Sequence, residues 1–248
     1  PILLSATPMP AVEVAQPMRL RDLFASSPLG TAGIFLLGSV YATQSGMAAV
    51  YGTRIGLPAE EIALFVAVLF GGALAFQYPI GWLSDRMDRR WLIFGAAAVG
   101  ASACGLGSLA EGRPELLLAS AFFAGGVTTP LYALFLAYTN DYLSAAEMPS
   151  ASGGLVFTFG LGAIAGPLVT GWAMERFVPS AFWWVLGATF AGSAFYALYR
   201  MTQRPAIPAA DTESYLGVLP TASPVAVEAA GTWAAEQAES ERADAEAG

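Results

Sequence analysis

The residue types that do most protein chemistry are scarce in this 248-residue chain. It has no histidine, and all eleven of its cationic side chains are arginines. A Ser-His-Asp triad, a histidine-ligated metal and a histidine proton relay therefore cannot be built from it. Cys104 is its only cysteine, which excludes an intrachain disulfide and a cysteine-rich metal site. We predict a protein that is not an enzyme, with no catalytic residue, no metal and no cofactor.

The charged residues with the most distinctive spacing lie at residues 81–90, which read Gly-Trp-Leu-Ser-Asp-Arg-Met-Asp-Arg-Arg. Gly81, at a helix end, allows a neighbouring helix to approach closely. Asp85 is placed to meet a helix N-terminus, whose partial positive charge favours a carboxylate. Three arginines can pair with this carboxylate: Arg86, Arg89 and Arg90. The spacing predicts a gating contact at a helix end.

The rest of the charge pattern predicts the elements that position this loop. Only 12% of the residues are charged, which is about half the share found in a soluble domain. The charges leave six windows of at least about 20 residues, the length that a helix needs to cross a membrane. The windows predict an all-α membrane protein, a bundle of six transmembrane helices at residues 29–50, 62–83, 91–110, 116–139, 150–173 and 180–200.

The chain divides into three parts. Residues 28–200 form the predicted six-helix domain. Residues 1–27 are a predicted cytoplasmic linker with a short amphipathic stretch. Residues 201–248 are acidic and rich in Ala, Pro and Glu, and we predict a cytoplasmic tail that is largely disordered. Seven arginines lie on one side of the predicted membrane and three on the other, so both termini are expected in the cytoplasm. The net charge of −8 argues against a nucleic-acid partner.

Residues 81–90 resemble the signature cytoplasmic loop of the major facilitator superfamily, Gly-x-Leu-(Ala/Ser)-Asp-(Arg/Lys)-x-Gly-(Arg/Lys)-(Arg/Lys). Nine of the ten positions fit, and Asp88 stands where the family usually has glycine. A plain positive-inside loop would explain the arginines but not the Gly-x-Leu-Ser-Asp spacing. Gly162, Gly166 and Pro167 are similar to the family's Gly-x-x-x-Gly-Pro segment in helices 5 and 11. There the glycines press on a partner helix and the proline kinks the helix.

The resemblance implies one half of a major-facilitator-type fold. The family comprises two six-helix halves related by internal repeats, with substrate bound between them at the membrane midplane. The chain begins where a sixth helix would end, so we expect the C-terminal half, helices 7 to 12. Its expected partners are the N-terminal six-helix half, which is absent from this chain, the lipid bilayer and a small-molecule substrate.

The resemblance also implies that helices 7 and 10, the first and fourth spans here, line the substrate cavity. The candidate cavity residues in these spans are Gln44, Thr43, Tyr41, Tyr132 and Thr129. An amide or hydroxyl that faces a wet cavity can donate and accept hydrogen bonds. The alternative is that these side chains only bond neighbouring helices. The sixth span is implied to lie outside the cavity, where Phe182, Trp183 and Trp184 suit an interfacial aromatic belt.

These features predict a secondary transporter of a small organic solute in the bacterial cytoplasmic membrane, working by alternating access. One alternative is a transporter-like scaffold that helps to assemble a membrane complex or delivers pigment to it. A second alternative is a standalone six-helix channel, against which the signature loop argues.

Overall fold

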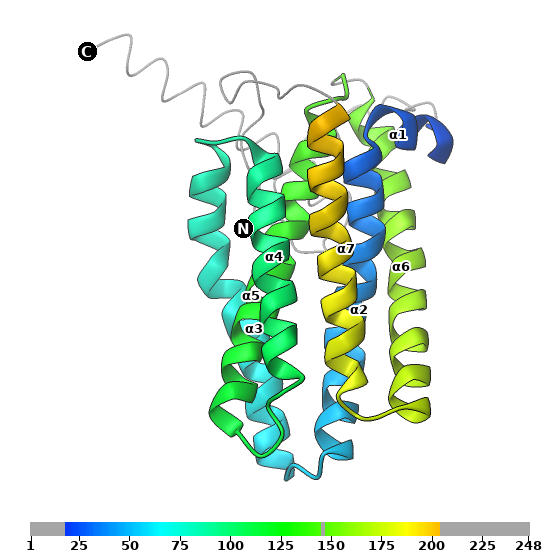
Figure 1. The fold of residues 1–248 in the computed structure, drawn as a ribbon. Helices are drawn as coiled ribbons and strands as arrows, with labels where there is room; N and C mark the ends of the chain where they lie inside the picture. The colour runs from blue at the N-terminus through cyan, green and yellow to red at the C-terminus, as the bar shows by residue number, and fades with distance from the viewer. Residues whose placement is uncertain (1–17, 145–146, 204–248) are drawn as a thin grey trace, which may run out of the picture.

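The computed structural model describes residues 18–144 and 147–203, which are helical apart from short connections (Figure 1). Its helices are α1 (Leu20–Ser26), α2 (Pro28–Arg54), α3 (Ala59–Ser84), α4 (Arg89–Gly107), α5 (Pro114–Asn140), α6 (Met148–Arg176) and α7 (Ala181–Gln203). In this described part, six helices, α2 to α7, are long and apolar enough to cross a membrane. The prediction of an all-α bundle with six spans is confirmed. Most of the predicted linker, residues 1–17, and of the predicted tail, residues 204–248, lies outside the described residues.

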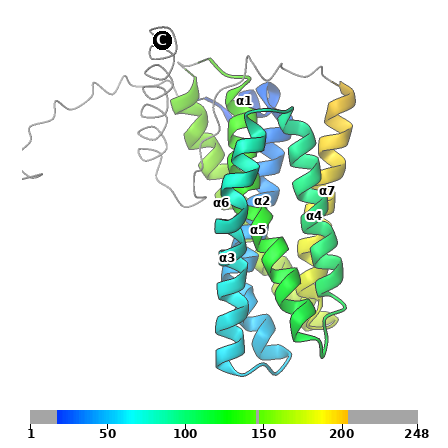
Figure 2. The ribbon, with the colours of Figure 1, turned by 90° about the vertical axis from the view of Figure 1, so that its left-hand side faces the viewer.

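The helix ends follow from short local signals. Pro28 and Pro114 begin α2 and α5, at a position where the missing N–H of proline has no intrahelical partner to lose. Gly56 and Gly112 turn the chain after α2 and α4 with φ of 78° and 69°, a region that glycine enters without steric cost. The connections are therefore short, and consecutive spans run antiparallel (Figure 2).

Two helix crossings built on glycine hold the bundle together, and the first joins α2 to α6. A Cβ atom on Gly38 would lie 2.2 Å from the carbonyl oxygen of Phe159. A Cβ atom on Gly162 would lie 1.9 Å from the carbonyl oxygen of Phe35. No side chain fits either position, so the two backbones are in direct contact. Close approach of this kind associates helices where lipid supplies no hydrophobic drive.

The second crossing joins α3 to α5 in the same way. A Cβ atom on Gly72 would lie 2.1 Å from the carbonyl oxygen of Phe122, and one on Gly125 would lie 2.1 Å from that of Leu69. Each helix again supplies one glycine and one carbonyl oxygen. The α3–α5 pair therefore repeats the α2–α6 pair.

The equivalence of the two crossings shows an internal repeat. Gly125 follows Gly38 by 87 residues, and Gly162 follows Gly72 by 90 residues. A shift of three helices thus carries α2 onto α5 and α3 onto α6. Because three antiparallel spans reverse the direction of the chain, the unit α5–α7 is inverted relative to the unit α2–α4. The same shift carries α4 onto α7, and these two helices pack against each other.

A buried aromatic group closes the end of the bundle at which α2 ends. The ring of Tyr51 stacks on Phe182 with a centroid distance of 4.9 Å, and Trp183 meets Tyr51 edge-on at 5.9 Å. The expectation of an interfacial belt is therefore wrong for Phe182 and Trp183, which are fully buried, whereas Trp184 is exposed. Consecutive residues on a helix point about 100° apart, so three in a row cannot share one lipid-facing side.

Candidate functional site

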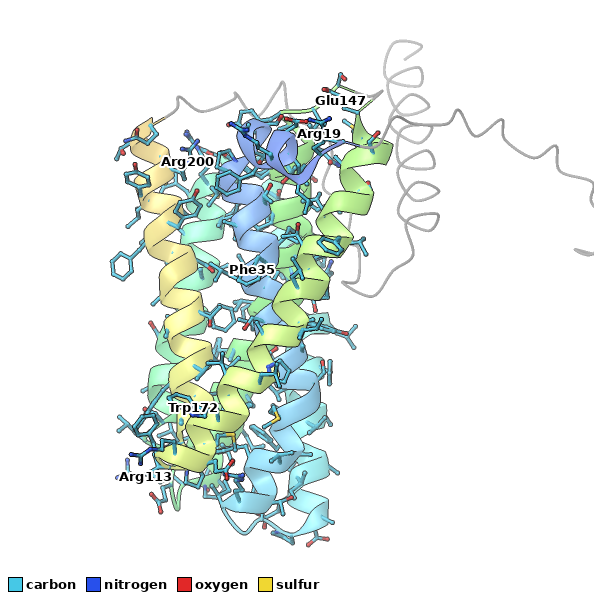
Figure 3. The ribbon with its side chains drawn as sticks, turned by 90° about the vertical axis from the view of Figure 1, so that its right-hand side faces the viewer. Arg19, Phe35, Arg113, Glu147, Trp172 and Arg200 are labelled. Carbon is cyan, nitrogen blue, oxygen red and sulfur yellow. The ribbon has the colours of Figure 1, made fainter. Side chains whose placement is uncertain are left out.

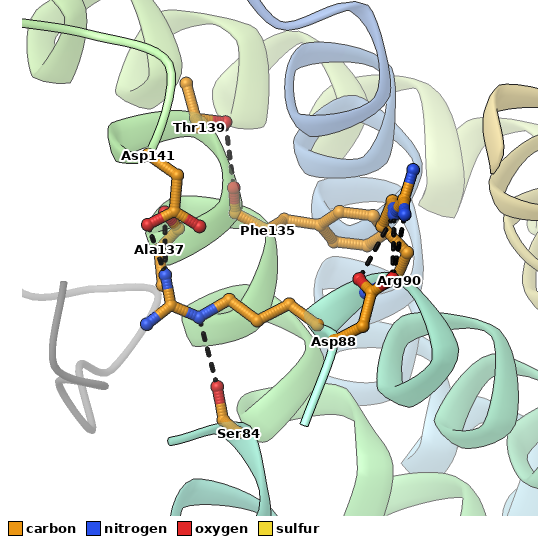
Figure 4. A network of polar contacts seen from close by, with 8 residues as sticks. Ser84, Asp88, Arg90, Phe135, Ala137, Thr139 and Asp141 are labelled. Atoms are coloured by element: carbon orange, nitrogen blue, oxygen red, sulfur yellow. Dashed lines mark hydrogen bonds and ion pairs between the residues drawn. The ribbon is translucent and has the colours of Figure 1, made fainter. Parts of the chain in front are cut away.

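The loop at residues 81–90 joins α3 to α4 and is tied to α5 by a buried ion pair (Figure 4). Arg89 Nη1, at the start of α4, lies 2.5 Å from Asp141 Oδ1, at the end of α5, and both side chains are buried. Arg89 also donates hydrogen bonds to Ser84 Oγ at 3.3 Å and to the carbonyl oxygen of Ala137 at 3.4 Å. A guanidinium also suits the negative end of the α5 dipole. Three helices are therefore fastened together at one point.

Asp88 replaces the glycine of the family pattern for a local reason. It is the N-cap of α4, where its Oδ1 accepts a hydrogen bond from the backbone N–H of Arg90 at 3.0 Å. The Arg90 guanidinium returns to the same carboxylate, with Nη2 2.8 Å from Oδ2. Aspartate is among the preferred N-cap residues, and the φ of −56° at this position does not require glycine. The turn between α3 and α4 is therefore stabilised by the side chain of Asp88 and does not need the flexible backbone of glycine.

Asp85 and Arg86 present the exposed charges of the loop. Asp85 is the C-cap residue of α3. Arg86 folds back onto the preceding turn, where its Nη1 donates to the carbonyl oxygen of Trp82 at 2.9 Å. Its guanidinium also lies 4.2 Å from the centroid of the Trp82 ring, within cation–π range. A carboxylate and a guanidinium are thus the groups of this loop that a second protein surface would meet first.

Asp141 is the residue of this site that sequence reasoning missed. It lies 52 residues from Arg89 along the chain, and no local pattern connects the two. One signal was present, because Asp141 is the only charged residue between Glu115 and Glu147. An acid that follows such a long apolar run invites a cation from another helix.

Three of the five predicted cavity residues meet at one small hollow between α2, α3 and α5. They are Gln44, Tyr41 and Thr129, and the wall is completed by Leu69, Phe70, Ala73, Gly125 and Thr128. Gln44 is buried, and its Nε2 donates to the carbonyl oxygen of Ala124 at 3.3 Å. The lining offers an amide, hydroxyls and aromatic rings, and it contains no charged side chain. The free volume is about 10 Å³, so an organic solute would need a second wall.

The other two predicted cavity residues face elsewhere. The hydroxyl of Thr43 lies 3.4 Å from that of Thr170 on α6, and Thr43 is fully buried. The ring of Tyr132 packs edge-on against Phe159 with a centroid distance of 5.5 Å. Both residues hold helices together in this arrangement. No group of three or more histidine, cysteine, aspartate or glutamate residues that could hold a metal ion occurs in the described ranges.

The Gly-x-x-x-Gly-Pro segment of α6 forms its contact with α2. Beside the Gly162 contact described above, a Cβ atom on Gly166 would lie 2.3 Å from the carbonyl oxygen of Ser39. The helix continues past Pro167 as far as Arg176. The segment therefore holds α6 in backbone contact with α2, the helix that carries Tyr41 and Gln44.

The two ends of the bundle differ in charge. Arg19, next to α1, and Arg200, near the end of α7, lie at the same end, which also holds the α3–α4 loop (Figures 1 and 3). Arg113 and Trp172 lie at the opposite end (Figure 3). The arginines of residues 81–90 add to the first end. The basic end is therefore the one that carries the signature loop and the buried ion pair.

This basic end also holds an acidic residue, Glu147, at the start of α6 (Figure 3). Glu147, the N-cap residue of α6, accepts hydrogen bonds from the hydroxyl of Ser144 at 2.6 Å and from its backbone N–H at 2.9 Å. These two bonds hold the pKa of Glu147 below its usual value. The carboxylate is thus charged beside the positive end of the α6 dipole.

Comparison with known proteins identifies a family and several relatives of this chain. The profile of the family described as Major Facilitator Superfamily matches residues 29–233. The uncharacterized MFS-type transporter YfkF of Bacillus subtilis is 28% identical over 143 residues, which are 58% of this chain and 36% of that protein. An uncharacterized MFS-type transporter of Yersinia pestis is 24% identical over 180 residues, 73% of this chain and 45% of the relative. The chain thus spans less than half the length of these curated relatives.

Proposed function

Since this chain belongs to the major facilitator superfamily, a family of membrane transporters, we propose that it forms the C-terminal half of a secondary transporter for a small organic solute. The chain is a multi-pass membrane protein of helices. A second six-helix half would account for the remaining length of its relatives. In this proposal the two halves rock against each other and open a central cavity to each side in turn.

The observation that carries the proposal is the hollow shared by Tyr41, Gln44 and Thr129. These residues lie well inside α2 and α5, remote from the helix ends, where a solute would cross the middle of the membrane. The hollow offers hydrogen-bond donors and acceptors on an otherwise apolar wall. The other half would supply the missing second wall. When the two halves close around the solute, they would exclude water from it.

The proposal places the signature loop at the cytoplasmic face. The end that carries α1, residues 81–90 and Arg200 is the more basic one, and arginine-rich loops stay in the cytoplasm. The Arg89–Asp141 pair fixes the loop to this half. Asp85 would then meet a helix N-terminus of the other half whenever the cytoplasmic side is closed.

Side-specific labelling of the full-length protein tests the proposal without knowledge of the solute. Thr129→Cys is introduced together with Cys104→Ala, and a membrane-impermeant maleimide is added to right-side-out or inverted vesicles. We expect labelling from both faces of the membrane, because Thr129 lines a cavity that opens alternately. The control is the protein with its native Cys104, which is buried against α7 and should stay unlabelled.

A different result has a clear meaning. Labelling of Thr129→Cys from one face only would contradict alternating access and would support a scaffold that keeps one conformation. If Thr129→Cys is labelled from neither face, the hollow is not part of an aqueous pathway.

A further inference from the structure

A second copy of the signature loop occurs at the end of α6. Residues 81–86 read Gly-Trp-Leu-Ser-Asp-Arg, and residues 171–176 read Gly-Trp-Ala-Met-Glu-Arg. Glycine, tryptophan and arginine recur at the same positions, and the acid before the arginine is preserved in charge. The two segments are separated by 90 residues.

The glycine crossings establish the same register independently. Gly162 occupies in α6 the place that Gly72 occupies in α3, and these two are also 90 residues apart. Burial agrees at four of the six positions and differs at the other two, because Leu83 is exposed whereas Ala173 is buried, and Gly81 is buried whereas Gly171 is intermediate. Ser84 and Met174 are buried, whereas the tryptophans and arginines of both copies are exposed. The two segments are therefore equivalent parts of the inverted repeat.

Inversion puts the two copies at opposite ends of the bundle. Residues 81–86 lie at the end that holds Arg19 and Arg200, and Trp172 lies at the other end (Figure 3). In the second copy the guanidinium of Arg176 lies 6.0 Å from the ring centroid of Phe177, which Trp172 meets edge-on at 5.8 Å. Each membrane face of this half thus carries one Trp-x-x-acid-Arg helix end.

The two copies are fastened to their own half by different chemistry. In the repeat, Arg54 is the residue equivalent to Asp141, and Pro179 is the residue equivalent to Arg89. The buried ion pair therefore has no counterpart at the other end. The buried aromatic group of Tyr51, described above, holds that end instead. The charges of the second copy form no ion pair within the described part of this half. Within residues 18–144 and 147–203 the carboxylate of Glu175 makes no hydrogen bond or ion pair.

We propose that residues 171–176 form an outer latch, which closes the extracytoplasmic face against the other half as residues 81–90 close the cytoplasmic face. The inference rests on the proposed function, because a latch needs a half that moves. Glu175 would meet a helix N-terminus of the other half, the attraction expected of a carboxylate there. Arg176 and Trp172 would cover that contact from the membrane side.

The competing explanation is that Trp172 and Arg176 only anchor the helix at the membrane interface. Tryptophan and arginine both suit that position. An anchor has no use for the acid, however, so Glu175 separates the two explanations.

The test compares three neutralised acids in full-length Thr129→Cys, Cys104→Ala protein, labelled by an impermeant maleimide from either side. Glu175→Gln should raise labelling from the extracytoplasmic side about two- to five-fold, the size expected for one charge at a helix terminus. Asp85→Asn should raise labelling from the cytoplasmic side. Glu60→Gln removes an exposed acid at the end of the bundle that holds Glu175 and should change neither rate.

The outcomes distinguish the inference from the proposed function. If Asp85→Asn shifts labelling and Glu175→Gln behaves like Glu60→Gln, the outer latch is wrong and alternating access stands. If Thr129→Cys is never labelled from both sides in any variant, the proposed function fails together with the latch. Because Glu175 is exposed, its replacement should leave the amount of protein in the membrane unchanged, which immunoblotting checks.

Discussion

At the scale of single residues, two side chains that are adjacent in sequence can make contacts of different kinds. Thr43 and Gln44 are adjacent, yet Thr43 meets Thr170 on α6 while Gln44 lines the hollow between α2, α3 and α5. A rotation of about 100° per residue separates their directions. The distinction matters because only Gln44 can lose a contact with solute when it is replaced.

Gln44→Ala in the full-length protein should weaken solute binding about two- to ten-fold, the value of one hydrogen bond. Binding is measured as protection of Thr129→Cys from the maleimide by a panel of uncharged organic solutes. Stability should change little, because interhelical polar contacts in membranes average about 0.6 kcal/mol. Thr43→Ala is the matched control and should leave protection unchanged. A Gln44→Ala protein that unfolds but still binds would make Gln44 a helix-bonding residue.

Asp141→Asn should destabilise the protein by about 3–5 kcal/mol, because it leaves the buried Arg89 guanidinium without its counter-charge. The measurement is thermal unfolding of the full-length protein in detergent. The double variant Arg89→Gln with Asp141→Asn should recover part of this loss, since neither charge is then left alone. Additive losses in the double variant would show that the two side chains act independently.

At the scale of helices, glycine sets which pairs touch. Gly162→Ala would force a methyl group against the carbonyl oxygen of Phe35, so we expect a loss of about 1–3 kcal/mol. Gly160→Ala, two residues away, meets open space and should be neutral or slightly stabilising. Thermal unfolding of the two variants measures the difference. Equal melting temperatures would mean that the α2–α6 contact adds nothing to stability.

The sequence predicts these helices well but not how they are turned. Charge-free windows located all six spans, because a charge inside a membrane is costly. The rotation of each helix was not predictable, since lipid and protein core are equally apolar and leave no polar face to identify the outside. The pairing of Arg89 with Asp141 was missed for the same reason. Pairing depends on which helices cross, and that information resides in glycines whose partners are distant in sequence.

At the scale of the whole molecule, the seven-to-three arginine bias predicts that both termini face the cytoplasm. Alkaline phosphatase, which is active only outside the cytoplasm, should be inactive when fused after Gln203 in the full-length protein. The same enzyme fused after Val178, in the connection between α6 and α7, should be active. The reverse pattern would invert the bundle and exchange the membrane faces assigned to the signature loop and to the outer latch.

The direct backbone contacts at the two glycine crossings have a mechanical consequence. Helices separated by side chains can slide, because rotamers change to absorb the displacement. At Gly38 and Gly162 there are no side chains to adjust, because each glycine lies directly against a carbonyl oxygen of the other helix. The two crossings therefore resist sliding of one helix along the other. Direct backbone contact opposes shear between α2 and α6 and between α3 and α5, so we expect each of these two pairs to move as a unit when the transporter changes conformation.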